Sequence, residues 1–237
     1  MLPRAETTGN TPDWLVKRRR LDAILRMQAA ILMGEPATQD AVRVLADALS
    51  DSDIEVREVA AAALADFGPD AELALPKLLT AAGDESSLVR RRAVRALGCL
   101  GSCEDALPAL VAATDDPDPG VSLQAAATLG DLGAAAAPAV PALMALLWTG
   151  DVRVRAVIGV ALARIGEAAV PALAQSLRHP SVDVRLKATQ ILAKIGPEAN
   201  LAIPALEHLT RSSDPTLRDA AVDALQHIRQ SPLSHQI

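Results

Sequence analysis

The sequence predicts an all-α solenoid of about six helical-hairpin repeats, because three markers recur along it in one register. A proline in a Pro-x-Leu pattern recurs at spacings of 32, 33, 30 and 33 residues. An arginine after Val or Leu recurs at a similar spacing, and a glycine lies eleven residues beyond it. A fixed period of this size indicates units that bury their apolar faces only against their neighbours. The markers are Pro76, Pro108, Pro141, Pro171 and Pro204; Arg57, Arg90, Arg155, Arg185 and Arg218; and Gly68, Gly101, Gly133, Gly166 and Gly196.

Two positions break the register. Ser122 takes the place of the arginine in the third copy, and Arg229 takes the place of the glycine in the last copy. A chain of 237 residues would ordinarily suggest one or two globular domains. The repeat instead predicts one continuous array over residues 37–230.

The two ends of the chain differ from the repeats. Residues 1–12 are polar and are predicted to be disordered, and residues 13–36 show the helical periodicity of an N-terminal capping helix. Residues 231–237 are predicted to form a flexible tail, too short and polar to cap the array. The apolar side of the last repeat is therefore expected to be partly exposed or covered by a second copy of the chain. This predicts self-association through the C-terminal repeat.

Each unit is predicted to contain two helices. The first begins near the proline, which suits the first helical turn because its missing N–H is no loss there. The second begins after a good N-cap residue four positions before the arginine register. Its apolar residues are expected to face the core, and the glycine is expected to end it in the left-handed conformation. The N-cap residues are Asp53, Ser86, Asp118, Asp151, Ser181 and Asp214, and the core residues of the second copy are Val89, Ala93, Ala96, Leu97 and Leu100.

Composition excludes several classes of function. The only aromatic residues are Trp14, Phe67 and Trp148, so the core must consist of Ala, Leu, Val and Ile. A net charge of −6 argues against general nucleic-acid binding, which needs a cationic surface. No apolar run long enough for a membrane span and no signal peptide are present, so no membrane partner is expected. Cys99 and Cys103 do not form a disulfide framework, which favours a reducing cytoplasm.

Three segments carry a resemblance to a known family. They are VRRRAVRALGCLG (89–101), VRVRAVIGVALARIG (152–166) and VRLKATQILAKIG (184–196), each followed by Pro-Ala-Leu. They resemble HEAT repeats, most closely the phycobilisome-lyase-like (PBS lyase HEAT-like) repeats of bacterial proteins. The resemblance implies a right-handed α–α superhelix whose second helices line the concave surface. It also implies a structural role for the arginines near the turns, where Asp51, Asp84 and Asp116 are candidate partners.

The exposed face of the second helices is the predicted partner-binding groove. Positions one, two, five and nine after the arginine register share one side of a helix. Apolar residues rimmed by charge are typical of protein-binding surfaces, although a mixed solvated face is the alternative. Three neighbouring arginines repel one another, which predicts a partner with an acidic segment. The candidate residues are Glu58, Arg91, Arg92, Arg95, Leu123, Gln124, Val157, Val160, Arg164, Leu186, Lys187, Gln190, Lys194, Asp219 and Asp223.

No residues are assigned to catalysis, to a cofactor or to a metal. The four histidines form no pair with one another or with cysteine at helical spacing, and the two cysteines are interpreted as inert thiols. The basic run 17–20 is interpreted as the solvated face of the capping helix rather than as a nucleic-acid site. The resulting hypothesis is a non-enzymatic, cytoplasmic protein–protein interaction scaffold. The alternative is a bilin lyase subunit, for which the scarcity of aromatic residues leaves few surfaces to stack on a tetrapyrrole.

Overall fold

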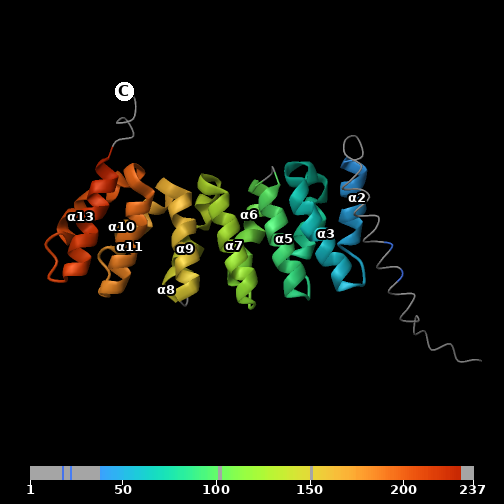
Figure 1. Ribbon diagram of the computed structural model, residues 1–237, viewed down its shortest axis with the longest axis horizontal. Coiled ribbons are helices and arrows are strands. Elements are labelled where there is room, and N and C mark those ends of the chain that lie inside the picture. The colour runs from blue at the N-terminus through green and yellow to red at the C-terminus, as the bar shows by residue number, and fades with distance from the viewer. Residues whose placement is uncertain (1–17, 19–21, 23–37, 101–102, 150–151, 231–237) are drawn as a thin grey trace, which may run out of the picture.

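The computed structural model describes residues 18, 22, 38–100, 103–149 and 152–230. Within them the chain forms helices and short connecting turns, without a strand. The helices stand side by side in a row from α2 at one end to α13 at the other (Figure 1). The all-α solenoid is thus confirmed. The predicted tail at 231–237 and the predicted capping helix at 13–36, apart from Arg18 and Asp22, lie outside the described residues, as does the predicted disordered segment 1–12.

The array consists of helix pairs, whose first and second members are called A and B helices below. The A helices are α2 (Thr38–Ala48), α4 (Leu75–Ala81), α6 (Cys103–Ala112), α8 (Val140–Thr149), α10 (Val170–Ser176) and α12 (Ile203–Leu209). The B helices are α3 (Ile54–Phe67), α5 (Ser87–Cys99), α7 (Pro119–Asp131), α9 (Val152–Ile165), α11 (Val182–Ile195) and α13 (Pro215–Arg229). Each B helix packs against its own A helix, and consecutive B helices pack against one another. The pairs follow the predicted register.

The connections from B helices to the next A helices differ from the sequence-based expectation. The chain turns through 3₁₀ segments, which are η1 (Gly68–Ala74), η3 (Gly133–Ala139), η4 (Gly166–Ala169) and η5 (Gly196–Ala202). A further 3₁₀ segment, η2 (Ala113–Asp115), follows α6. Gly68 has the positive φ expected of a helix-ending glycine, 56°, but its ψ of −133° lies outside the predicted left-handed helical conformation. The observed region is open essentially to glycine alone, which explains the residue type. In the third repeat, α6 begins at Cys103 and Pro108 lies inside it rather than at its start.

The predicted N-caps hold where the residue is aspartate. Asp53 accepts a hydrogen bond from the N–H of Glu55 at 2.9 Å, and Asp118 and Asp214 accept equivalent bonds in their repeats. Ser86 and Ser181 occupy the N-cap position with extended backbone, but their side chains make no capping hydrogen bond. Their predicted capping role is therefore wrong. Asp151 lies outside the described residues.

Replacing Asp214 with alanine is expected to lower the free energy of unfolding by about 1 kcal/mol, because the N–H of Leu217 loses its acceptor. Ser181→Ala is the matched control and should change stability little, since Ser181 makes no such bond. Urea denaturation of the two variants measures the difference. Equal losses for both variants would contradict the assigned cap.

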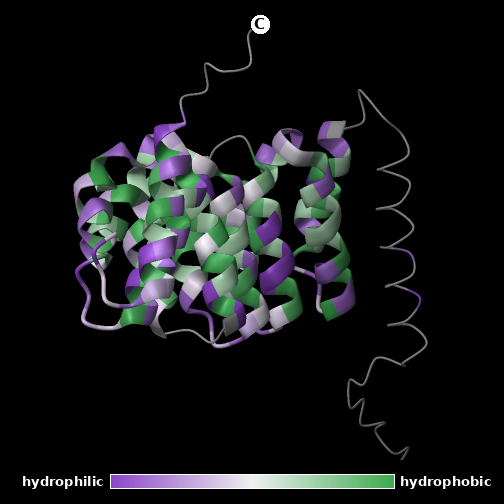
Figure 2. Cartoon of the chain, turned by 60° about the vertical axis from the view of Figure 1, so that its left-hand side comes forward, coloured by the Kyte–Doolittle hydropathy of each residue, from purple (hydrophilic) through white to green (hydrophobic). Residues whose placement is uncertain are grey.

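The core is continuous along the array, and hydrophobic and hydrophilic residues are interspersed along the helices from end to end (Figure 2). All five core residues predicted for the second copy are buried. The sequence reasoning missed the position four residues after the arginine register, which is buried because it packs against the next B helix. Its members are Ala61, Val94, Ala126, Gly159 and Thr189. In the last repeat the same position is Val222, which is 44 % exposed because no further B helix packs against α13 among the described residues.

One stretch, Arg153–Ser176, is long and apolar enough to cross a membrane by length and composition. In the structure it is α9, η4 and α10, interrupted at Gly166, where φ is 76°. Ile158, Leu162 and Leu173 within it are buried between neighbouring helices. Packing inside the array thus accounts for its hydropathy, as it does for core helices generally.

Candidate functional site

The register arginines tie adjacent repeats together at the turns between A and B helices. The Nε and Nη2 groups of Arg57 donate to the two carboxylate oxygens of Asp84 at 2.7 and 3.0 Å. Arg90 binds Asp116 in the same way at 2.7 and 2.8 Å. Each arginine also donates through Nη1 to a backbone carbonyl of its own turn, that of Asp51 or Asp84, at 2.9 Å. The expected structural role is confirmed for these two arginines.

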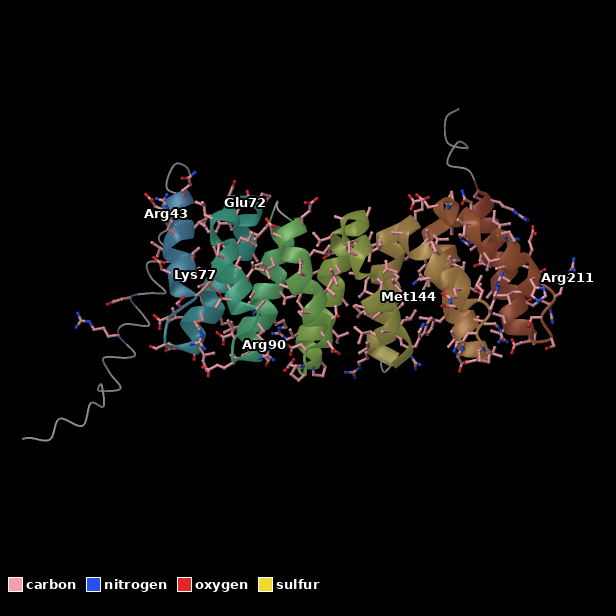
Figure 3. The ribbon with its side chains drawn as sticks, turned by 180° about the vertical axis from the view of Figure 1, so that it is seen from behind. Arg43, Glu72, Lys77, Arg90, Met144 and Arg211 are labelled. Carbon is pink, nitrogen blue, oxygen red and sulfur yellow. The ribbon has the colours of Figure 1, made fainter. Side chains whose placement is uncertain are left out.

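These carboxylates are held in the ionised form. The hydrogen bond from Arg90 lowers the pKa of Asp116 below its ordinary value, although burial opposes it. Burial raises the pKa of Asp84, but hydrogen bonds from Arg57 and the N–H of Ser86 and the charge of the arginines leave it lowered overall. Arg90 lies at one long edge of the array, opposite the edge that carries Glu72 (Figure 3). A ladder of Arg–Asp pairs therefore runs along this edge in the first repeats.

After the third repeat the aspartate of the Arg–Asp ladder is replaced by other residue types. The position six residues before the arginine register is Asp51, Asp84 and Asp116 in the first three copies, then Thr149, His179 and Ser212. Arg185 and Arg218 donate to the backbone carbonyls of His179 and Ser212, at 2.6 and 2.9 Å. Arg155 makes no hydrogen bond or ion pair within the described part of the chain. The later repeats thus keep the arginine without the carboxylate.

The candidate residues lie on all six B helices, and neighbouring helices bring them together into one face, called the B face below. None of them is buried. The half-exposed members are Glu58, Arg91, Arg92, Leu123, Gln124, Val157, Leu186 and Lys187. The more exposed members are Arg95, Val160, Arg164, Gln190, Lys194, Asp219 and Asp223.

The argument from mutually repelling arginines is wrong, because α3 supplies counter-charges. Arg92 pairs with Glu58 at 3.2 Å, and Arg95 pairs with Asp66 at 3.6 Å. Arg91 makes no ion pair with any described residue. The pairs connect neighbouring B helices, so they contribute to stacking. The sequence patterns did not predict these ion pairs, because the two residues of each pair are about one repeat apart in the chain.

A third ion pair between B helices borders the centre of the B face. Arg164 of α9 pairs with Asp131 at the end of α7. Beside this pair lies an apolar hollow of about 270 Å³, lined by Ala127, Gly130, Ala156, Val157, Val160, Ala161 and Arg164. Val160 is 43 % exposed at its surface. The structure therefore joins two predicted apolar residues, Val157 and Val160, into one concavity.

The glycine in this hollow allows the close approach of the two helices. A Cβ built on Gly130 would lie 2.8 Å from Cα of Ala161, which leaves no room for a side chain. Glycine inside a helix costs stability relative to alanine, so its presence there is a signal of close packing. Gly130, inside the helix of the third repeat, is therefore the sequence signal of this close approach.

The sequence matches HEAT repeats over residues 12–97, 75–163 and 140–226. The chain belongs to the HEAT-repeat family. No match was found among curated proteins. This HEAT-repeat protein resembles, with a TM-score of 0.51 and 28% identity, a chain from the complex of CpcE and CpcF of phycocyanin lyase from Nostoc sp. PCC7120. The match covers 79% of this chain and 76% of that chain.

Engineered repeat proteins share the architecture of this HEAT-repeat protein. One engineered protein aligns with a TM-score of 0.57 and 22% identity, covering 95% of this chain and 67% of its own. A designed armadillo repeat protein aligns with a TM-score of 0.50 and 22% identity, covering 78% of this chain and 98% of its own. These similarities support the solenoid fold alone.

The C-terminal end of the HEAT array carries another concavity, of about 440 Å³, between α12 and α13. It is bordered by the ion pair between Arg229 and Glu207 and by exposed Val222. The outer side of α13 also exposes Asp223 and Gln226. Among the described residues of α12 and α13, Val222 is the exposed large hydrophobic side chain, and its neighbours are mainly polar. Self-association stays a prediction. Among the described residues, no group of three or more His, Cys, Asp or Glu side chains is arranged to hold a metal ion.

Proposed function

We propose that this HEAT-repeat protein is a non-enzymatic scaffold that binds a protein or peptide along its B face. The observation that carries the proposal is the apolar hollow between α7 and α9, with Val160 exposed at its surface. Apolar concavities bordered by charged groups are the usual anchoring points of protein interfaces. The fold supports the proposal because a stack of repeats presents one extended surface to a partner.

The charges around the hollow favour a partner with an acidic segment. Arg91 lies on one side of the hollow, on α5, and Lys187 and Lys194 lie on the other side, on α11. None of the three makes an ion pair with a described residue. Cations without intramolecular partners are available to steer and orient an acidic ligand. This basic region ends at α13, where the B face carries the acidic residues Asp219 and Asp223.

The scaffold proposal is tested by Val160→Glu. This variant places a charge in the apolar hollow, and it does not disturb the core because Val160 is not buried. We expect at least about a tenfold loss of partner capture, because a charge in an interface core is desolvated without compensation. Leu201→Glu is the matched control, since Leu201 is 66 % exposed and lies on η5, away from the hollow. Capture from cells of the source organism, quantified by mass spectrometry, compares the wild type with both variants. Equal capture by all three proteins would refute the proposed site.

A bilin lyase subunit is the second candidate, and the similarity to the chain from the CpcE–CpcF complex is what favours it. Binding of a bilin would change its visible absorption spectrum on addition of the protein. Trp148 and Phe67 are the aromatic residues among those the structure describes, so stacking surfaces for a tetrapyrrole are few. The absence of a spectral change at saturating protein would eliminate this candidate.

A further inference from the structure

The Arg–Asp pairs of the first repeats provide an internal template for the fourth repeat. In the template, the carboxylate that binds the arginine also accepts a backbone N–H of its own turn. Asp84 accepts the N–H of Ser86 at 2.9 Å while it binds Arg57. At the equivalent place opposite Arg155, Nδ1 of His179 accepts the N–H of Ser181 at 3.1 Å. His179 therefore preserves the turn but supplies no negative charge to Arg155.

A hollow of about 380 Å³ lies beside Arg155. It is lined by Trp148, Arg155, Ser181, Asp183, Val184 and Lys187, from α8, α9 and the start of α11. Arg155 and Lys187 are both half-exposed, and neither makes a hydrogen bond or an ion pair within the described residues. Asp183 forms no ion pair with either cation. Among the described residues, the hollow therefore holds two available cations against one carboxylate.

The hollow is continuous with the proposed binding face. Lys187 belongs to the B face and also lines the hollow, and its Cε lies 3.6 Å from a Cβ built on Gly159 of α9. The same helix supplies Val157 and Val160 to the apolar hollow. A peptide that covers the apolar hollow would thus reach Arg155 by extending along α9 towards its N-terminal end.

We infer that Arg155, Lys187 and Trp148 form a carboxylate-binding site for an Asp or Glu side chain of the bound protein partner. The partner's carboxylate supplies to Arg155 the negative charge that Asp84 and Asp116 supply to Arg57 and Arg90 in the first repeats. A guanidinium fork binds a carboxylate through two parallel hydrogen bonds, as Arg57 and Arg90 do, and the ammonium of Lys187 adds a second positive charge. The inference rests on the proposed function, because the occupant is a segment of the scaffold's partner.

The site contains its own spectroscopic probe. Trp14 and Trp148 are the only tryptophans, so Trp14→Phe leaves Trp148 as the sole source of indole fluorescence. In that background, a capped hexaglutamate peptide is expected to change the fluorescence saturably. A capped hexaglutamine peptide of the same length is the matched control and is expected to bind at least about tenfold more weakly, because it lacks the charge-assisted hydrogen bonds. Added salt should weaken the hexaglutamate response.

Three variants test the residues. His179→Asp places an internal carboxylate opposite Arg155, as in the template, and is expected to raise the melting temperature and weaken hexaglutamate binding at least about tenfold. Arg155→Ser introduces the residue type that the third repeat has at the same position, Ser122. This variant is expected to weaken hexaglutamate binding as much as His179→Asp does, without lowering the melting temperature. Asp183→Asn removes a like charge from the hollow and is expected to tighten binding.

Several outcomes would overturn the inference. A fall in melting temperature for Arg155→Ser as large as that for Arg90→Ser would show that the chain itself fills the site. Equally tight binding of glutarate and hexaglutamate would assign the site to a small carboxylate instead of a peptide. If Val160→Glu abolishes partner capture but hexaglutamate causes no fluorescence response, the carboxylate site is refuted and the scaffold proposal stands. If hexaglutamate binds but Val160→Glu captures every partner as well as the wild type does, the scaffold proposal is refuted instead.

Discussion

Arg90→Ala is expected to lower the free energy of unfolding by about 2–4 kcal/mol, because it removes one partner of a largely buried ion pair. The side chains of Arg90 and Asp116 are 15% and 9% exposed. The variant leaves the carboxylate of Asp116 desolvated and without its bidentate donor. It also removes a donor from the carbonyls of Asp84 and Glu85. Urea denaturation of the purified full chain measures the loss.

The chain offers a matched control for this prediction. One repeat further along the chain, Ser122 and Thr149 occupy the positions equivalent to those of Arg90 and Asp116. Arg90→Ser combined with Asp116→Thr reproduces that neutral pair and removes both charges together. Its loss of stability should be clearly smaller than that of Arg90→Ser alone, since no charge is left unpaired. A single variant as stable as the double variant would show that the pair contributes little to stacking.

Gly130→Ala is expected to lower the free energy of unfolding by about 1–3 kcal/mol, as overpacking generally does. The added Cβ would lie 2.8 Å from Cα of Ala161 and 3.1 Å from its Cβ. Because the nearest atom belongs to the backbone of α9, relief requires that α7 and α9 separate. Alanine is otherwise the better helix former, so the expected loss runs against intrinsic propensity.

Gly159→Ala is the control for this clash. Gly159 also lies within a B helix, but an added Cβ would meet Ile191 and Lys187 at 3.6 Å, an ordinary contact distance. Alanine there is expected to stabilise the protein by about 0.5–1 kcal/mol through its helix propensity. Thermal denaturation should therefore give shifts of opposite sign for the two glycine variants. Shifts of the same sign would contradict the packing described for α7 and α9.

The two halves of the array are held together differently. In the first repeats the turns are joined by Arg–Asp pairs, whereas Arg185 and Arg218 bind only carbonyls of their own turns among the described residues. An ion pair that spans two repeats restrains their relative orientation, and a bond within one turn does not. This difference places Arg155 and the proposed partner site in the half whose turns, among the described residues, are not joined by Arg–Asp pairs.

The sequence alone determined the repeat register and the features that act within one repeat. The period, the helix pairs and the core positions such as Val89 and Leu97 follow from local patterns of apolar and capping residues. Asp53 and Asp214 cap their helices as predicted, because an N-cap bond joins residues two or three positions apart. The candidate face was also predictable, since helical periodicity places residues such as Val157 and Val160 on one side.

The tertiary structure alone decided what happens between repeats. It pairs Arg92 with Glu58, opens the hollow beside Gly130, and groups Arg155 with Lys187 and Trp148 around another hollow. These relations join residues about one repeat apart, and they depend on the lateral offset and rotation between neighbouring helices. Local periodicity does not specify that offset. It is set by side-chain volumes at the contacts, such as the absent side chain of Gly130, and therefore emerges only when the repeats are stacked.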